Sequence, residues 1–129
     1  MSQNQSNLIK LAIEKAKQNL GSTGENPSVG CLVVKNNSVI SSAITSKNGR
    51  PHAEFLALSK NKNFYNAQLY VSLEPCSHYG KTPPCTNIIL KKKIKKVIFP
   101  FVDNNPITKR KAFHILKKKK NKSYSFKKE

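Results

Sequence analysis

The sequence predicts an α/β fold in three layers, α/β/α, on a mixed sheet of about five strands that opens with an antiparallel hairpin. The length of 129 residues suits one compact domain. Two segments rich in β-branched residues, Val29 to Lys35 and Ser38 to Thr45, are separated only by Asn36-Asn37, which is typical of a hairpin turn. Beyond them, helix-like and strand-like segments alternate. Strands separated by helices need crossover connections and pair in parallel.

The first half of the chain places a helix on each side of the hairpin. The first helix is expected from Leu8 to Leu20, because apolar residues recur there at helical spacing and Gly21 follows as a stop. A second, shorter helix is expected from about His52 to Ser59. Gln68 to Leu73 has the composition of the third strand. We expect the helices to cover both faces of the sheet.

Proline and glycine interrupt the second half of the chain. Glu74 to Pro84 carries three prolines and one glycine and is expected to be a loop. A helix, a strand and another helix follow: Pro84 to Lys92, Lys96 to Phe101 and Thr108 to Lys118. The basic tail from about residue 117 is expected to be either a frayed end or a short edge strand at Ser123 to Phe126.

The charge balance is strongly basic. The chain has 24 Lys and Arg against 6 Asp and Glu, a net charge of +18. Clustered cations neutralise phosphates, so nucleic acid is one class of partner to weigh. However, only Arg50 and Arg110 are arginine, in a chain also crowded with Asn and Ile, which favours a bias in nucleotide composition. Aromatic residues that could stack on bases are sparse. We therefore expect no nucleic-acid partner.

Nothing in the sequence predicts secretion. No apolar run approaches the roughly 20 residues that cross a bilayer, and the N-terminus lacks the regions of a signal peptide. We expect a cytoplasmic location and no membrane partner. The three cysteines, Cys31, Cys76 and Cys85, are odd in number and favour metal binding or buried thiols over disulfides. Cys31 lies in a strand expected at the centre of the sheet, and we interpret it as a core residue.

Two short segments carry the residues that indicate chemistry: Pro51-His52-Ala53-Glu54 and the loop from Cys76 to Cys85. One imidazole, from His52, and two thiolates, from Cys76 and Cys85, make a Cys₂His set for Zn²⁺ and leave the fourth tetrahedral position open for water. A structural zinc site fills all four positions, and the sequence offers no obvious fourth ligand. The pattern therefore predicts a catalytic zinc site.

The spacing of His52 and Glu54 places the metal beyond the start of a helix. The two residues are separated by about 200° of helical rotation, so they converge only past the helix N-terminus. Cys85 begins the next expected helix, so both helix N-termini would favour the anionic ligands. Because two thiolates neutralise Zn²⁺, a carboxylate is needed to take a proton from water. We predict that Glu54 is this general acid/base.

H-x-E with a downstream P-C and a further cysteine is the signature of zinc-dependent deaminases. In detail, the chain resembles the deaminase domain of the bifunctional riboflavin-biosynthesis deaminase/reductase, in the cytidine-deaminase-like superfamily. The similarity covers about residues 26–106 and is carried by Asn26-Pro27-Ser28-Val29-Gly30-Cys31, by His52-Ala53-Glu54 and by residues 73–85. Most members of the superfamily place two residues between the cysteines, whereas this chain places eight, S-H-Y-G-K-T-P-P. The resemblance implies the three-layer cytidine-deaminase-like fold.

The resemblance also implies a substrate, a diaminopyrimidinone that carries ribosylamine and a 5′-phosphate. Water would attack the ring carbon that bears the 2-amino group, and ammonia would leave. Glu54 would take the proton of the water, protonate a ring nitrogen and then protonate the departing amine. Lys81 would face the phosphate, and His78 would donate to a ring oxygen or to the phosphate. The full set of implied substrate-binding residues is Asn26, His78, Lys81, Thr82, Asp103 and Asn105.

The chain departs from the pattern of this family at three places. Thr45 stands where a substrate-contacting histidine is often found, and the family's glycine turn is absent after Pro106. The chain also ends where the reductase domain would begin. We therefore expect residues 1–129 to form a single deaminase domain, with the pathway reductase on a separate chain or in a removed segment. Relatives commonly assemble, so a homo-oligomer is also expected.

Two alternatives stay open. A deaminase of nucleosides or of tRNA adenosine would agree with the basic charge but fits the eight-residue spacing less well. A catalytically inactive RNA-binding relative would have no need of Glu54.

Overall fold

The computed structural model describes residues 2–76, 81–100, 115 and 123–126 of the 129. The elements along the chain are α1 (Gln3–Lys17), β1 (Gly30–Lys35), β2 (Ser38–Ile44), the short 3₁₀ helix η1 (Lys47–Gly49), α2 (Ala53–Leu58), β3 (Gln68–Val71), α3 (Cys85–Lys91), β4 (Lys96–Phe99) and β5 (Ser123–Phe126).

The strands form one mixed sheet in the order β2-β1-β3-β4-β5. β1 pairs antiparallel with both β2 and β3, whereas β4 is parallel to β3 and β5 is parallel to β4. Asn36 and Asn37 join β1 to β2 with φ values of 51° and 64°, and two positive φ values are what a type I′ hairpin turn requires. The predicted mixed sheet with an opening antiparallel hairpin is confirmed.

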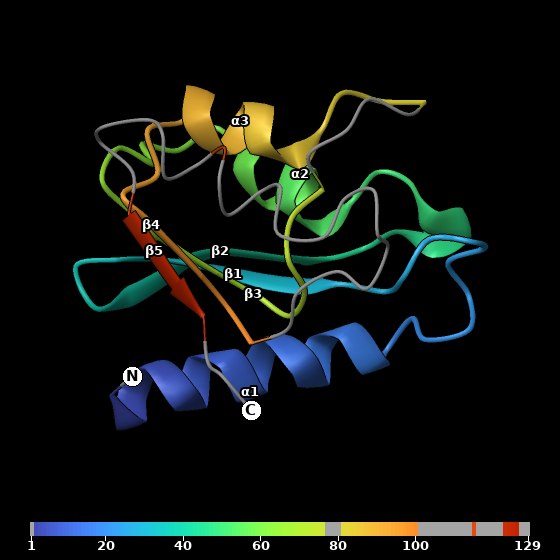
Figure 1. Ribbon diagram of the computed structural model, residues 1–129, viewed down its shortest axis with the longest axis horizontal. Helices are drawn as coiled ribbons and strands as arrows, with labels where there is room; N and C mark the ends of the chain where they lie inside the picture. Colours follow the sequence, from blue (N-terminus) through green and yellow to red (C-terminus); the bar gives the residue numbers. More distant parts are fainter. Residues whose placement is uncertain (1, 77–80, 101–114, 116–122, 127–129) are drawn as a thin grey trace.

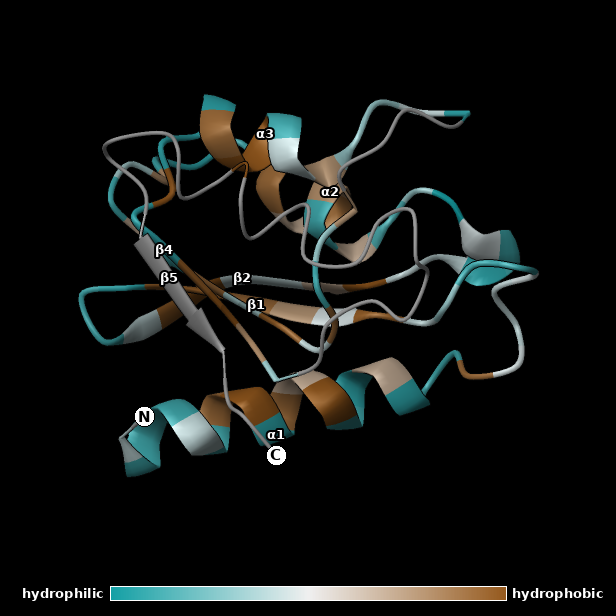
Figure 2. Cartoon of the chain, viewed as in Figure 1, coloured by the Kyte–Doolittle hydropathy of each residue, from teal (hydrophilic) through white to brown (hydrophobic). Residues whose placement is uncertain are grey.

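Helices cover both faces of the sheet, as predicted. α1 lies along one face, and α2 and α3 lie together on the other (Figure 1). Alternate residues of β1 serve the two layers: Leu32 and Val34 pack toward α1, while Cys31 and Val33 pack in the cluster that includes α2 and α3. Figure 2 shows the apolar side of α1 turned toward the sheet. The sheet therefore positions α2 and α3 on a rigid support.

The observed α1 begins and ends earlier than the expected range of Leu8 to Leu20. Ser2 is its N-cap: its Oγ accepts a hydrogen bond from the Gln5 backbone N–H at 3.1 Å, and the Gln5 side chain accepts one from the Ser2 N–H at 3.0 Å. This capping box satisfies backbone donors at the helix start and extends the helix through a polar turn. The apolar pattern alone did not reveal that turn.

The other boundaries shift by a few residues. β3 ends at Val71 rather than at Leu73, and β4 ends at Phe99 rather than at Phe101. Of the helix expected from Thr108 to Lys118, only Ile115 lies within the described residues, and it is helical. In the tail, Ser123–Phe126 forms the edge strand β5, which was one of the two predicted states.

Gly30, the first residue of β1, lies where α1 crosses the sheet most closely. A Cβ at this position would overlap the carbonyl oxygen of Ala12 and lie 2.9 Å from the backbone N of Ala16. We expect Gly30→Ala to lower the free energy of unfolding by about 1–3 kcal/mol, because α1 must move outward. Urea unfolding followed by circular dichroism measures this. A variant as stable as the parent would contradict the close approach.

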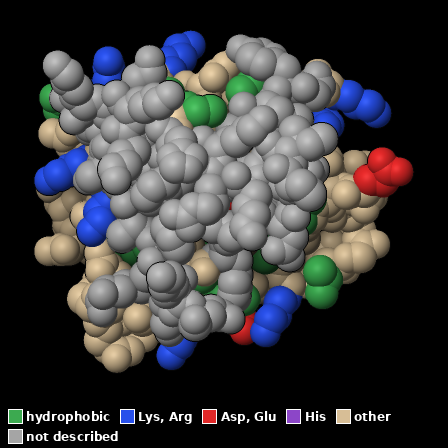
Figure 3. Space-filling view, viewed as in Figure 1, with side chains coloured by type: hydrophobic (Ala, Val, Ile, Leu, Met, Phe, Trp, Pro, Cys, Tyr) green, Lys and Arg blue, Asp and Glu red, His purple; other side chains and the backbone are tan. Residues whose placement is uncertain are grey.

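In Figure 3, the described Lys and Arg side chains are scattered around the margin of the face in view. None of the helices that the structure describes combines the length and the apolar character needed to cross a bilayer.

Candidate metal centre and active site

Three residues from separate segments meet where α2 and α3 begin. His52 is the N-cap residue of α2, and its side chain makes no capping hydrogen bond. Cys85 is the first residue of α3, after the N-cap Pro84. Cys76 lies in the loop that follows β3, and its Sγ accepts a hydrogen bond from the Cys85 backbone N–H at 3.2 Å. The local start of each helix thus aims one ligand-type side chain at the same point.

The spacing of these side chains fits a metal ion. The Nδ1 atom of His52 lies 3.7 Å from Cys76 Sγ and 3.5 Å from Cys85 Sγ. The potential ligand atoms of the three residues all lie within 4.8 Å of one another. In a tetrahedral site with Zn–S of about 2.3 Å and Zn–N of about 2.0–2.1 Å, neighbouring N and S ligands lie about 3.6 Å apart. The two N···S distances match that edge, so the donor set can hold a metal.

The two thiols are tightly coupled. A hydrogen bond from Cys85 lowers the pKa of Cys76 to about 4, and the same bond, together with burial, raises the pKa of Cys85. A hydrogen bond with Cys76 also raises the pKa of His52 against the opposing effect of burial. The pocket thus stabilises anionic sulfur, and a bound divalent cation would deprotonate both thiols.

Glu54 stands beside this group in the first turn of α2. Its side chain is only 3% exposed, and burial, followed by the proximity of Cys76, raises the pKa of its carboxyl group to about 7. Among the residues that the structure describes, no group donates a hydrogen bond to Oε1. A buried carboxylate oxygen without a partner is costly, so this atom needs a ligand, a water or a transferable proton.

Glu54 lines a cavity of about 120 Å³ together with His52 and Cys76, two of the three residues of the metal-binding group. Asn26 and Thr82, both predicted to bind substrate, line it as well. The side-chain Nδ2 of Asn26 donates to the carbonyl oxygen of Gly49 at 3.0 Å, which ties this wall of the cavity to the turn before α2. Gly49 has φ of +91°, and a Cβ there would lie 2.8 Å from Asn26 Nδ2. The turn therefore requires glycine for this contact.

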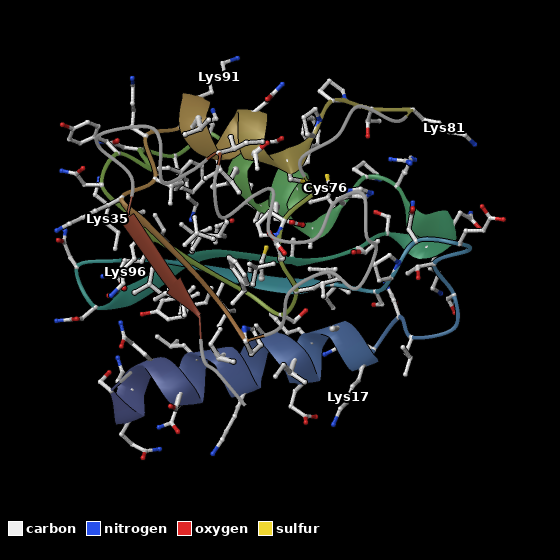
Figure 4. All side chains as sticks on the ribbon, viewed as in Figure 1. Lys17, Lys35, Cys76, Lys81, Lys91 and Lys96 are labelled. Carbon is white, nitrogen blue, oxygen red and sulfur yellow. The ribbon has the colours of Figure 1, made fainter. Side chains whose placement is uncertain are left out.

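Of the other predicted substrate residues, Lys81 is the one that the structure describes. Lys81 is exposed and is not among the described residues that line the cavity, and Figure 4 shows it at the outer margin, away from Cys76. His78, Asp103 and Asn105 lie outside the described residues.

Thr45 lines the same cavity, but its hydroxyl serves the backbone. It is 1% exposed, and its Oγ1 accepts a hydrogen bond from the Val29 N–H at 3.0 Å. The side-chain amide of Asn19 donates to the Thr45 carbonyl oxygen at 2.8 Å. At this position the chain thus has a structural hydroxyl in the wall of the cavity.

Two charged residues of the cavity wall did not emerge from the sequence as site residues, Arg50 and Glu74. Glu74 is 4% exposed and lies in the loop after β3, where nothing in the sequence distinguishes it from other loop residues. A signal for Arg50 did exist. It is one of only two arginines in a lysine-rich chain, and it lies two residues before His52.

Cys31 belongs to the core, as its strand position predicted. It is fully buried, its Sγ donates to the Ala53 carbonyl oxygen at 3.3 Å, and burial raises the pKa of its thiol. We expect Cys31→Ala to keep the full metal content and to lower the free energy of unfolding by about 1 kcal/mol. Metal analysis and urea unfolding of the same sample test both. Loss of metal from this variant would contradict the placement of Cys31 outside the ligand set.

Comparison with known proteins places the chain in a family. The family described as the cytidine and deoxycytidylate deaminase zinc-binding region matches residues 2–100. The chain belongs to this family. The predicted membership of the cytidine-deaminase-like superfamily is confirmed.

Within this deaminase family, similar proteins carry names from riboflavin biosynthesis. The chain is 45% identical over 100 residues to the chloroplastic riboflavin biosynthesis protein PYRD of Arabidopsis thaliana, covering 77% of this chain and 24% of that protein. It is 41% identical over 99 residues to the diaminohydroxyphosphoribosylamino-pyrimidine deaminase of Buchnera aphidicola subsp. Acyrthosiphon pisum, covering 76% and 67%. The chain thus spans about a quarter of the first relative and two thirds of the second.

A solved deaminase-family structure has the same fold. RibD of Acinetobacter baumannii superposes with a TM-score of 0.88 at 40% identity, over 95% of this chain and 34% of that one. The three-layer fold predicted for the chain is confirmed by this likeness.

Proposed function

We propose that the chain is a zinc-dependent hydrolytic deaminase that acts on the diaminohydroxyphosphoribosylaminopyrimidine of riboflavin biosynthesis. One observation carries the catalytic part of this proposal: Glu54, whose buried Oε1 has no hydrogen-bond partner among the described residues, lines the same cavity as His52 and Cys76 of the metal-binding group. A structural metal site has no use for such a carboxylate. A hydrolytic site needs one to move protons.

The substrate part of the proposal rests on the relatives and on the loop between the cysteines. The Buchnera relative is named as the diaminohydroxyphosphoribosylamino-pyrimidine deaminase. The eight-residue spacing between Cys76 and Cys85 also supports this branch over the nucleoside and tRNA branches.

His52 Nδ1, Cys76 Sγ and Cys85 Sγ would hold the zinc ion. When bound, zinc lowers the pKa of water and so supplies a nucleophile at neutral pH. The Cys85 N–H keeps Cys76 Sγ in place by its hydrogen bond of 3.2 Å.

Glu54 moves the protons of the reaction. Its raised pKa, near 7, lets the carboxylate accept the proton of the attacking water and give it up again close to neutral pH. Glu54 passes that proton to a ring nitrogen. It then carries the second proton of the same water to the departing amine. One water is consumed, the C–N bond at the 2-amino carbon breaks, a carbonyl forms and ammonia leaves.

Substrate choice is tested by ammonia release from three compounds side by side. We expect the zinc-loaded protein to release ammonia from the phosphoribosylated pyrimidine and not from cytidine or adenosine. Faster release from cytidine or adenosine would replace this proposal with the nucleoside alternative. RNA binding that weakens steeply with salt, without any ammonia release, would favour the inactive RNA-binding relative.

We propose that Lys81 attracts the substrate phosphate from the outer margin of the molecule. We expect Lys81→Ala to lower kcat/KM for the phosphorylated substrate by about 10- to 150-fold, since a charge-assisted contact contributes about 1.5–3 kcal/mol. The control is Lys10→Ala, which removes the same charge from an exposed position of α1, across the sheet. Equal effects of the two variants, or equal effects on phosphorylated and dephosphorylated substrate, would contradict the contact.

The location and the assembly of the protein are also proposals. We propose a cytoplasmic protein that forms a homo-oligomer. Size-exclusion chromatography with light scattering tests the assembly.

A further inference from the structure

Arg50 spans the mouth of the catalytic cavity. It is half-buried, and its Nη1 donates a hydrogen bond of 2.9 Å to Thr82 Oγ1 on the other side of the opening. The same Nη1 lies 3.4 Å from Nε2 of His52. Arg50 therefore connects the turn before α2 with the loop that precedes α3.

The guanidinium of Arg50 has spare hydrogen-bonding capacity. No carboxylate in the described part of the chain pairs with it, and the ion pair found there joins Lys17 to Glu14. An arginine has five N–H donors, and the hydroxyl of Thr82 takes only one. A half-buried guanidinium with N–H donors to spare can bind an anion.

The contact between Arg50 and His52 also indicates a binding site for an anion. Nδ1 of His52 faces the two thiols, so Nε2 carries the hydrogen in a neutral imidazole that binds a metal through Nδ1. The second nitrogen of a metal-binding histidine usually donates to an acceptor, yet a guanidinium has no acceptor atom. Two donors thus lie 3.4 Å apart, and an anionic oxygen beside them would accept from both.

Arg50 also lies where two cavities adjoin. The inner one, with Glu54, has about 120 Å³, and an outer one between α2 and α3 has about 540 Å³. Arg50, His52 and Thr82 line both. Ligand pockets usually enclose about 300–1,000 Å³, so the inner cavity suits a single ring. Because Arg50 lines the outer cavity as well, it lies beside any part of a larger substrate that extends from the inner cavity into the outer one.

We propose that Arg50, oriented by Thr82, binds the phosphate of a phosphoribosylated substrate where the two cavities adjoin. This contact makes the enzyme select phosphorylated over unphosphorylated substrate. This inference rests on the proposed function for the identity of the substrate. Arginine suits the role because its planar fork can bind two phosphate oxygens at once, which a lysine ammonium does not do.

The first test measures binding to the zinc-loaded protein by calorimetry, with ribose 5-phosphate as the probe and ribose as its uncharged counterpart. We expect Arg50→Ala to weaken binding of ribose 5-phosphate by about 10- to 150-fold, Arg50→Lys to restore part of it, and Lys10→Ala to leave it unchanged. The zinc content of all three variants should equal that of the parent. The proposal is overturned if the parent does not bind ribose 5-phosphate, or if Arg50→Ala and Lys10→Ala bind it alike.

The second test is kinetic and separates this inference from the proposed function. With the phosphorylated pyrimidine, Arg50→Ala should raise KM far more than it lowers kcat, and with the dephosphorylated pyrimidine it should change little. If the parent releases ammonia but Arg50→Ala treats both compounds alike, the role of Arg50 is wrong and the function stands. If the parent binds ribose 5-phosphate through Arg50 yet releases no ammonia, the function is wrong and the anion site stands.

Discussion

Glu54→Gln is expected to keep one zinc per chain and to lose turnover by about 10²–10⁴-fold, the usual contribution of a general acid/base. The amide has nearly the shape of the carboxylate but cannot take a proton from water or pass it to the amine. Because Glu54 lies outside the group formed by His52, Cys76 and Cys85, its replacement should leave that group intact.

The matched control for Glu54→Gln is Glu25→Gln, the same isosteric change at an exposed carboxylate. It should behave as the parent protein does. Loss of zinc from Glu54→Gln would reassign Glu54 as a ligand or as a structural residue. Turnover close to that of the parent would remove it from the mechanism.

Cys76→Ser and Cys85→Ser are expected to abolish activity through the loss of zinc. A change in the residue that merely orients a metal ligand costs about 10–100-fold in metal affinity, and loss of a ligand itself should exceed this. Each cysteine supplies one of the sulfur atoms found 3.7 Å and 3.5 Å from His52 Nδ1. A hydroxyl is a much poorer zinc ligand than a thiolate.

Metal analysis of unstripped protein checks this second prediction. The parent should carry about one zinc per chain, the two serine variants far less, and Cys31→Ala as much as the parent. If Cys76→Ser or Cys85→Ser retained full zinc, the ligand assignment would be wrong. An inactive variant that kept its metal would separate the thiol's role from metal binding.

The parts of the fold that local chemistry dictates were predictable from the sequence. Asn36-Asn37 between two β-branched segments predicted the hairpin, and the structure has positive φ at both residues. The start of α1 was not predicted, because it depends on the polar capping box of Ser2 and Gln5 rather than on an apolar pattern. The ends of β3 and β4 depend on pairing across the sheet, which a single segment does not encode.

In the candidate site, too, some residues were predictable from the sequence and others were not. The motif residues His52, Glu54, Cys76 and Cys85 were identifiable because their types and order have few other uses. The rarity of arginine marked Arg50, but its contact with Thr82 was not predictable, because that contact depends on how the turn before α2 meets the loop before α3 and joins residues 32 positions apart. Pairwise contacts of this kind follow from the tertiary fold.

The most direct measurement of the central claim is ammonia release from the phosphoribosylated diaminopyrimidine by zinc-loaded protein, before and after treatment with a chelator. We expect steady release that stops when the zinc is removed and returns when one zinc per chain is restored. No release from the zinc-loaded protein, or release that the chelator leaves unchanged, would contradict it.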